Sequence, residues 1–317
     1  MSLPVELKNA IDKKIENISL GALQKHSEAL SWHYREAKEG AISISSDLER
    51  LSYLSVRMPA TYAAISLVLR ELLLRSPDFF PQTILDMGAG PGTALWAVDE
   101  VFGKSWEKAH LLEKDGAFIQ LGRELYPADE EKVQWKMCDM TSVELSSSYD
   151  LVLASFSLGE IHSQLWKKML SEMWKSTKKI ITIIEPGTPK GFERIKKIRG
   201  YLIEMGAHLV APCPHFQNCP IEGSDWCHFG ARVQRSSIHR NIKKGTINYE
   251  DEKFCYLIFS KDPIPGASSR VLSRPQKHTG FVKLKLCTPD GIKNITVSKK
   301  SKEIYKKARK VEWGDSF

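Results

Sequence analysis

The chain has 317 residues, of which 42% are hydrophobic and 26% charged, as in a globular protein with one large core. Its most apolar stretch, TYAAISLVLRELLL, contains Arg70 and Glu71, so the sequence excludes a membrane-spanning helix and predicts no membrane partner. The N-terminal sequence mixes acidic and basic side chains, unlike a signal or transit peptide, and this predicts a cytoplasmic location, most simply in a bacterium.

The net charge of +8 is concentrated at one end of the chain. Residues 1–80 hold ten basic and ten acidic side chains, whereas residues 261–317 hold fourteen Lys or Arg against five Asp or Glu. A run of lysines is often only the solvated face of a helix. A whole terminal segment of one sign on a neutral body, however, favours binding to a polyanion such as RNA.

Apolar residues recur at helical spacing over residues 4–38 and 46–76, which predicts a helical N-terminal part at 1–80. Over residues 81–262, short β-rich runs alternate with single helices, so the strands should pair in parallel with right-handed crossovers. With a final antiparallel strand in DEKFCYLIFSKD, the pattern predicts an α/β fold with the Rossmann-like, seven-stranded sheet of class I methyltransferases.

Two further segments are attached to this domain. Residues 212–250 form a cysteine-rich insertion between the last two strands. Residues 263–317 form a small, basic C-terminal β extension, and the Pro-, Gly- and Ser-rich stretch at its start is typical of a linker. Alternating runs on either side of Pro-Asp-Gly then predict a β-hairpin, which is followed by a short basic helix.

A glycine-rich loop in LDMGAGPGTALWAV joins the first strand to a helix. Glycines there permit positive φ and let a ligand approach the backbone and the helix N-terminus. The third glycine follows the second by two residues rather than three, which favours S-adenosylmethionine over a dinucleotide. Acidic residues on the first three strands fit the same crevice, although each alone is more often a cap or a solvent-facing residue. The predicted cofactor-binding residues are Asp86, Gly88, Gly90, Gly92, Glu113 and Asp139. A vestigial site that binds no cofactor is the alternative.

The sequence does not identify catalytic residues. The fourth strand ends in ASFSLGEIH, which lacks both an Asn-Pro-Pro-Tyr-type loop for an amine and a cysteine that could attack a pyrimidine ring. Glu160 and His162 lie near that edge and could act as a base, but a polar pair that opens a helix more often caps it. We therefore assign no catalytic residue.

Six cysteines are too few for a disulfide-built scaffold, so we expect reduced thiols. Cys213, Cys219 and Cys227 lie close together in loop-forming sequence, and a metal site there needs a fourth ligand. The candidates are His215, His228, Cys138, Cys255 and Cys287. We favour Cys287, because it lies beside the predicted hairpin turn, where a side chain projects freely, whereas Cys138 and Cys255 lie in strands and should be core residues. Irregular spacing favours an iron–sulfur cluster, and zinc or no metal are the alternatives.

The stretches PCPHFQNCP, DWCHFGARVQRS, YEDEKFCYLIFS and LCTPDG, with RMPATYAA and LDMGAGPGTA, resemble the methyltransferase-like family of small ribosomal subunit assembly factors. This family includes mitochondrial methyltransferase-like protein seventeen and its fungal and bacterial relatives, and the likeness covers nearly the full chain. It implies a class I methyltransferase fold with S-adenosylmethionine at Gly88–Gly92. It also implies a 4Fe-4S cluster on the matching Cys213, Cys219, Cys227 and Cys287.

The resemblance further implies binding to small-subunit ribosomal RNA and to assembly intermediates, in ribosome assembly or translation. We expect no transit peptide, unlike in the mitochondrial members, and a monomer away from the ribosome. Two hypotheses stay open, namely a methyltransferase that acts on ribosomal RNA and a non-catalytic assembly chaperone. A third is a zinc-containing small-molecule methyltransferase.

Overall fold

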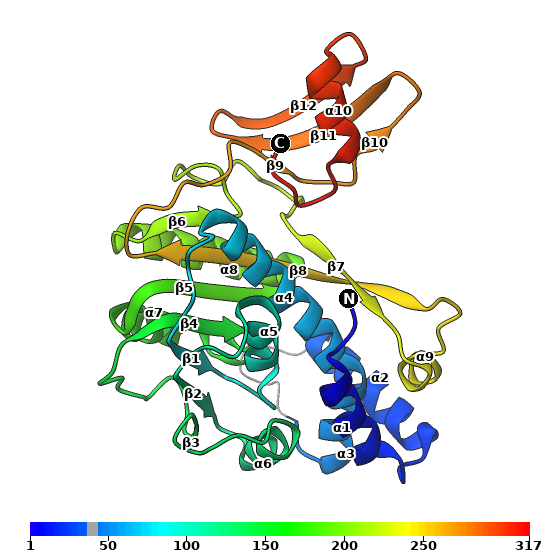
Figure 1. Cartoon of the computed structure of the whole chain (residues 1–317), viewed down its shortest axis with the longest axis vertical. Helices are drawn as coiled ribbons and strands as arrows, with labels where there is room; N and C mark the ends of the chain where they lie inside the picture. Colours follow the sequence, from blue (N-terminus) through cyan, green and yellow to red (C-terminus); the bar gives the residue numbers. More distant parts are fainter. Residues whose placement is uncertain (37–43) are drawn as a thin grey trace.

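The computed structural model describes residues 1–36 and 44–317, and Figure 1 shows a central sheet flanked by helices, with a small second sheet at one end. The helices are α1 (Val5–Ile15), α2 (Leu20–Glu36), α3 (Asp47–Ser52), the π-helical η1 (Tyr53–Arg57), α4 (Met58–Arg75), α5 (Thr93–Phe102), α6 (Gly116–Leu125), the 3₁₀ turns η2 (Leu158–Glu160) and η3 (Ser163–Leu165), α7 (Trp166–Lys175), α8 (Pro189–Glu204), α9 (Ser237–Ile242) and α10 (Lys302–Lys310). The strands are β1 (Thr83–Met87), β2 (Lys108–Glu113), β3 (Val133–Met137), β4 (Tyr149–Ser155), β5 (Thr177–Pro186), β6 (His208–Ala211), β7 (Phe229–Gln234), β8 (Tyr249–Ser260), β9 (Arg270–Val271), β10 (Gln276–Lys277), β11 (Phe281–Thr288) and β12 (Gly291–Ser298).

Local capping explains where two of the N-terminal helices begin. The Glu49 N–H donates to the Ser46 hydroxyl at 3.2 Å, and the Ser46 N–H donates to the Glu49 carboxylate at 3.1 Å, which forms a capping box at α3. Pro59 lies in the first turn of α4, directly after η1, a position at which helices tolerate proline. The helices predicted over 4–38 and 46–76 are confirmed in the described residues, and the last two positions of the first range lie outside them.

The central sheet has the strand order β3-β2-β1-β4-β5-β8-β6. Strands β1 to β5 pair in parallel, whereas β8 is antiparallel to both β5 and β6. This order, with its reversed strand, is that of class I methyltransferases, so the predicted fold is confirmed. The order changes direction between β1 and β4, and ligands of open α/β sheets bind in the crevice outside the carboxyl ends of the strands at such a point.

In the described part of the chain the sheet has eight strands rather than the predicted seven. The additional strand, β7, pairs with the first half of β8, from Phe229 opposite Phe254 to Gln234 opposite Tyr249. Its sequence, FGARVQ, includes a glycine and two polar residues, so its own strand propensity is weak. The long β8 supplies the hydrogen-bonding partner that local sequence does not reveal.

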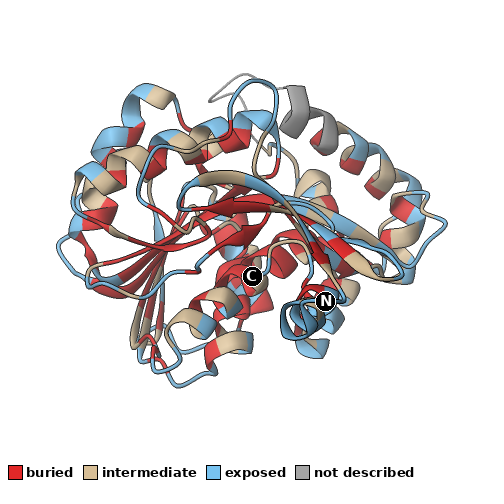
Figure 2. Cartoon of the chain, turned by 90° about the horizontal axis from the view of Figure 1, so that it is seen from above, coloured by how far each residue is buried: buried red, intermediate tan, exposed pale blue. Residues whose placement is uncertain are grey.

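Helices cover both faces of the sheet, and Figure 2 shows the strands as the buried layer between them. Side chains of α4 and α5 form one core with the strands, and side chains of α7 and α8 form a second core on the opposite face. Because α4 is buried along most of its length, it fastens the N-terminal helices to the sheet. None of the described helices combines the length and apolar character that crossing a bilayer requires.

The C-terminal extension is a four-stranded sheet with a core of its own. β11 and β12 pair in antiparallel fashion, and Thr288 lies opposite Gly291 at the turn, so the predicted hairpin is confirmed. The predicted basic helix is confirmed as α10. The linker predicted before it is wrong in part, because Arg270 and Val271 form β9 and Arg270 is only 1% exposed. Composition marks that stretch as flexible, but its buried partners lie far away in sequence.

We propose that the chain divides into a helical N-terminal part (1–80), a methyltransferase-like domain (81–262) with an insertion at 212–250, and a C-terminal extension (263–317). The insertion is more than loop, since it contains β7 and α9.

Candidate functional site

The glycine-rich loop lies between the end of β1 and the start of α5. Gly88, Gly90 and Gly92 have φ values of +75°, +54° and +80°, a region that favours glycine. A Cβ added to Gly88 would lie 2.5 Å from the Cβ of Ser157, so the loop packs tightly against the end of β4. A Cβ added to Gly90 would meet no described atom within 4 Å, so the loop is open to a ligand there.

Glu113, at the end of β2, faces this loop. Its carboxylate accepts hydrogen bonds from the backbone N–H groups of Gly90 at 2.8 Å, Lys114 at 2.8 Å and Asp115 at 2.9 Å. An ionised carboxylate offers about four lone-pair sites. Glu113 therefore supports the loop and keeps acceptor capacity for a ligand hydroxyl.

Asp86 lies in β1 behind the loop and is 2% exposed. Both of its carboxylate oxygens are buried without a hydrogen-bond partner among the described residues. Burial, together with the negative charge of Glu113, raises the pKa of Asp86 to about 7. A buried, unpaired carboxylate of this kind is suited to a cationic or hydrogen-donating ligand.

Asp139 follows β3 and is exposed. Its carboxylate accepts hydrogen bonds from the N–H and the hydroxyl of Thr141, at 2.8 and 2.7 Å, and these bonds lower the pKa of Asp139. Among the six predicted cofactor-binding residues, four line one cavity and the other two lie outside its wall. The lining residues are Gly88, Gly90, Glu113 and Asp139.

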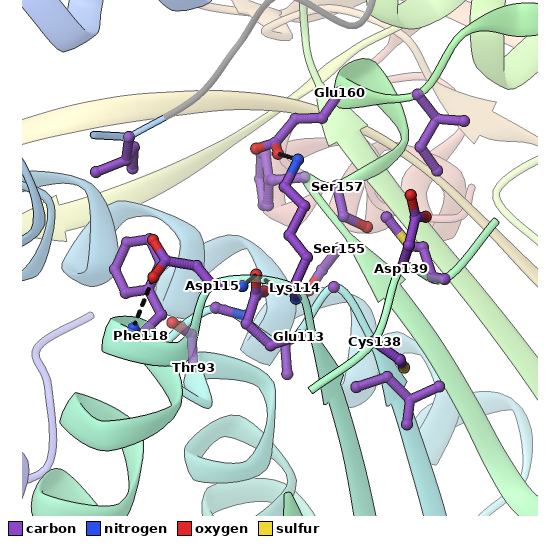
Figure 3. A pocket seen from close by; sticks show the side chains of 18 of the residues that line it. Thr93, Glu113, Lys114, Asp115, Phe118, Cys138, Asp139, Ser155, Ser157 and Glu160 are labelled. Atoms are coloured by element: carbon purple, nitrogen blue, oxygen red, sulfur yellow. Dashed lines mark hydrogen bonds and ion pairs between the residues drawn. The ribbon is translucent and has the colours of Figure 1, made fainter. Parts of the chain in front are cut away.

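This cavity has a volume of about 860 Å³ and is shown in Figure 3. The sequence did not predict the part of its wall that Arg50, Tyr53 and Thr61 contribute from the N-terminal helices. Arg50 donates to the Asp115 carboxylate at 2.9 Å, and the rings of Tyr53 and Phe118 pack edge to face at 5.4 Å. No motif marks these residues, because only the docking of the helices against the sheet brings them to the cavity.

The opposite wall follows the end of β4. Phe156 there has φ of +57°, an uncommon conformation for a residue other than glycine and one often found at functional sites. Lys114 Nζ lies 3.1 Å from the Glu160 carboxylate, and Figure 3 shows this pair across the cavity. Burial raises the pKa of Glu160 to about 7, although Lys114 opposes the shift. His162 lines the same wall, but nothing in the geometry makes either residue a catalytic base.

A second cavity, of about 40 Å³, lies between α8, the cysteine-rich insertion and β11. Its wall includes Cys213, Cys219, Cys227 and Cys287, the four predicted metal ligands, together with His215 and Cys255. Cys287 is buried, at 7% exposed, and does not project freely as predicted, because β11 carries it against the insertion. Cys255 is a buried core residue, as predicted, and its thiol donates to the Cys227 carbonyl at 3.0 Å. Cys138 is only half-buried and lines the larger cavity instead.

Two buried arginines also line the cysteine cavity. Arg199, from α8, donates to the carbonyls of His215 at 2.7 Å and Gln217 at 2.8 Å. Arg270, from β9, donates to the Pro212 carbonyl at 2.9 Å. The arginines hold the backbone around the thiols and bring positive charge to them. Neither is marked by a sequence motif.

Burial raises the pKa of Cys213 and Cys227, and it raises that of Cys287 to about 12. Neighbouring thiolates repel one another and add to these shifts, while the two arginines oppose them at Cys213 and Cys287. The thiolates of Cys213, Cys227 and Cys287 are therefore favoured here only beside a positively charged group, as metal ligands are. Among the described residues, no three His, Cys, Asp or Glu side chains are placed to hold a single metal ion.

The sequence of this sheet and its insertion matches one known family. The model of the family described as "Mitochondrial small ribosomal subunit Rsm22" matches residues 47–317. The chain belongs to the Rsm22 family. This confirms the resemblance on which the sequence prediction relied.

Two relatives are ribosome assembly proteins. Human METTL17, described as a mitochondrial ribosome assembly protein, is 25% identical over 96% of this chain and 68% of its own length. RSM22 of Saccharomyces cerevisiae, described in the same way, is 24% identical over 80% of this chain and 64% of its own. Magnesium protoporphyrin IX methyltransferase of Synechocystis, solved with bound SAH, has a TM-score of 0.43 and 10% identity over 75% of this chain and 99% of its own.

The predicted cellular location of the protein is contradicted by the proteins to which the chain is related. The family description and the relatives from human, fission yeast and budding yeast are all mitochondrial, so the prediction of a bacterial cytoplasmic protein is wrong. That prediction depended on the charge pattern of the N-terminal sequence. The pattern reports the chemistry of a local helix, α1, and not the compartment of the protein.

Proposed function

We propose that this chain binds S-adenosylmethionine and acts in assembly of the small ribosomal subunit, where an iron–sulfur cluster stabilises its RNA-binding part. Membership of the Rsm22 family supports the assembly role, as does the description of the human and yeast relatives as ribosome assembly proteins. The observation that carries the cofactor proposal is the crevice in which an open glycine, Gly90, meets Glu113 in front of the unpaired carboxylate of Asp86.

Each polar group of S-adenosylmethionine has a suitable partner at this crevice. Glu113 can accept from a ribose hydroxyl, and Asp139 can accept from the adenine amino group. The carboxylate of Asp86, which lies behind the loop, suits the ammonium group through water, and the N-terminus of α5 suits the carboxylate of the cofactor. When bound, the cofactor supplies an electrophilic methyl group, and the residues of this chain hold and orient it.

Calorimetric titration with S-adenosylmethionine tests this proposal, and we expect Gly90→Ala to weaken binding by roughly tenfold or more. The added methyl group occupies the space that faces the ligand, and φ of +54° disfavours alanine. Gly103→Ala is the matched control, because Gly103 has φ of +76° and open surroundings at the far end of α5. Absence of binding heat with the wild-type protein would refute the cofactor proposal.

The cysteine cavity supports the cluster proposal. Cys213, Cys219 and Cys227 come from the insertion and Cys287 comes from β11, and all four line one cavity beside two buried arginines. A cluster spreads its four attachment points over a larger polyhedron than a single zinc ion does, which suits thiols that come from both the insertion and β11.

Replacement of Cys287 by Ser should remove the brown visible absorption of anaerobically purified protein, because a cluster with three thiolates is poorly retained. Iron and sulfide analysis of the same samples checks the cause. Cys138→Ser is the control and should keep its colour, since Cys138 lines the other cavity. Unchanged colour in Cys287→Ser removes this residue from the ligand set, and zinc in place of iron supports the zinc alternative.

A non-catalytic assembly role is the second candidate function. The observation that favours it is the ion pair with Lys114, which engages Glu160 at the wall where a base would act. Transfer of labelled methyl groups to small-subunit particles from a strain that lacks the protein separates the two functions. Incorporation into ribosomal RNA shows an enzyme, and binding without incorporation shows an assembly chaperone.

A further inference from the structure

The C-terminal sheet has one covered face and one open face. Successive side chains of a strand point to opposite faces. Along β11, Val282 and Leu284 belong to the core that α10 covers, so Phe281, Lys283 and Lys285 lie on the other face. The helix thus leaves the second face of this sheet to other contacts.

The neighbouring strand continues this open face. Residues directly opposite each other in antiparallel strands share a face, and β12 places Thr296 opposite Lys283 and Asn294 opposite Lys285. Lys283, Asn294 and Thr296 are all exposed. The face therefore offers ammonium, amide and hydroxyl groups to solvent in two adjacent rows.

An aromatic pair lies at the outer end of the same face. The rings of His278 and Phe281 stack at 4.5 Å with an angle of 22° between their planes, and His278 is exposed while Phe281 is half-buried. Lys283 Nζ lies 6.0 Å from the centre of the Phe281 ring. The Lys299 N–H donates to the Gly280 carbonyl at 2.9 Å, which brings a further lysine to this end of the sheet.

The inner end of the face reaches the cysteine-rich insertion. Lys285 forms an ion pair with Asp225 at 2.7 Å, and Cys287, two residues further along β11, lines the cysteine cavity. The face is thus fixed at this end by the insertion and free at the aromatic end.

We propose that the open face, defined by His278, Phe281, Lys283, Lys285, Asn294 and Thr296, binds single-stranded RNA. An unpaired base stacks on the aromatic pair, Lys283 contacts a phosphate, and Asn294 and Thr296 donate to or accept from base edges and sugar hydroxyls. This inference rests on the proposed function in ribosome assembly and deepens it, because it names the surface and the form of RNA that it fits.

The chemistry favours single strands over the alternatives. Bases in a duplex are stacked on one another, so a duplex offers no free ring face to Phe281, whereas loops and ends do. An acidic protein surface would match the lysines but would leave the stacked rings and the amide without a role. The charge of the extension, fourteen basic against five acidic residues in 261–317, matches a polyanion in either case.

Fluorescence anisotropy with the full chain tests the inference, with a short oligouridylate, the matching duplex RNA and a small-subunit RNA transcript as probes. We expect Phe281→Ala to weaken oligouridylate binding roughly 5- to 100-fold, as loss of one stacked base does. Phe281→Tyr should bind like the wild type, because it keeps the ring. Lys283→Gln should reduce the salt dependence of log Kd by a slope of about 0.7, the value of one phosphate contact.

Lys306→Gln is the matched control for charge. Lys306 is an exposed residue of α10, and this helix packs on the side of the sheet opposite the open face. It should leave binding close to that of the wild type, and thermal unfolding verifies that every variant is folded. If the transcript binds but folded Phe281→Ala and Lys283→Gln bind as tightly as the wild type, the open face is not the RNA site, and the assembly proposal stands. Equal affinity for duplex and single strand also overturns the inference. Absence of binding to every probe overturns the RNA-binding part of the proposed function as well.

Discussion

Arg270 connects parts of the molecule that are far apart in the sequence. Its guanidinium donates to the Pro212 carbonyl in the insertion at 2.9 Å and to the Gly314 carbonyl near the C-terminus at 2.7 Å. It also donates to the Glu71 carboxylate in α4 at 2.7 Å. A buried charge with all its partners in place is costly to disrupt, because removal of the arginine leaves each acceptor without its donor.

We therefore expect Arg270→Met to lower the free energy of unfolding by roughly 3 to 5 kcal/mol, measured by urea denaturation. Arg75 also donates to Glu71, which places the expected loss toward the lower end. Arg274→Met is the control, because Arg274 is an exposed residue whose pair with Asp251 should contribute less than about 1 kcal/mol. Similar losses in both variants would contradict a special role for Arg270.

Asp86 should make the free energy of unfolding of the ligand-free protein fall as the pH rises. Its folded pKa of about 7 lies above the usual value of 3.8, so between these values the native state binds a proton that the unfolded state has lost. Stability from this group is therefore full at low pH and falls as the pH rises toward 7. The Asp86→Asn variant does not ionise and should escape this loss.

In denaturation at pH 5 and pH 8, Asp86→Asn should gain roughly 1 to 3 kcal/mol relative to the wild type on going to the higher pH. Asp139→Asn serves as the control. Hydrogen bonds from Thr141 lower the pKa of Asp139, so the contribution of Asp139 to the free energy of unfolding changes only in solution more acidic than pH 5. A constant difference between Asp86→Asn and the wild type at the two pH values would show that Asp86 is already ionised at pH 5.

At the scale of elements, the sequence predicted what short-range patterns encode. The alternation of β-rich and helical runs is local, and so is the turn at Pro-Asp-Gly, and both are confirmed. β7 was missed because its pairing with β8 supplies what its own sequence lacks. The stretch before β10 was misread as a linker because the partners of Arg270 are distant in sequence.

The same distinction separates the predicted from the unpredicted parts of the two cavities. The glycine loop and Glu113 could be found because spacing along a strand, a turn and a helix is visible in the sequence. Arg50 and Tyr53 could not, since they reach the larger cavity only when the N-terminal helices dock. The convergence of Cys287 with the insertion was a hypothesis from distant residues, and β11 does bring it to the cysteine cavity.

At the scale of the whole molecule, the cysteine cavity is the junction between the central sheet and the C-terminal extension. Around it, Trp313 from the C-terminal end contacts the His228 ring at 5.0 Å, and Trp226 of the insertion donates to the Gly187 carbonyl beyond β5 at 3.0 Å. The contacts of Arg270 and the Lys285–Asp225 ion pair complete the junction. The small extension core alone gives little resistance to local opening.

If a cluster joins the four cysteines, its binding free energy is in part the free energy that orders this junction. Removal of iron by a chelator should then increase amide hydrogen exchange in residues 213–228 and 281–298. Exchange in β1 and β4 should stay unchanged, because these central strands are covered on both faces and do not depend on the insertion. Mass spectrometry of deuterated protein, with and without iron, measures each segment. Unchanged exchange in 281–298 would mean that the side-chain contacts alone hold the extension in place and that the cluster does not control the order of the open face.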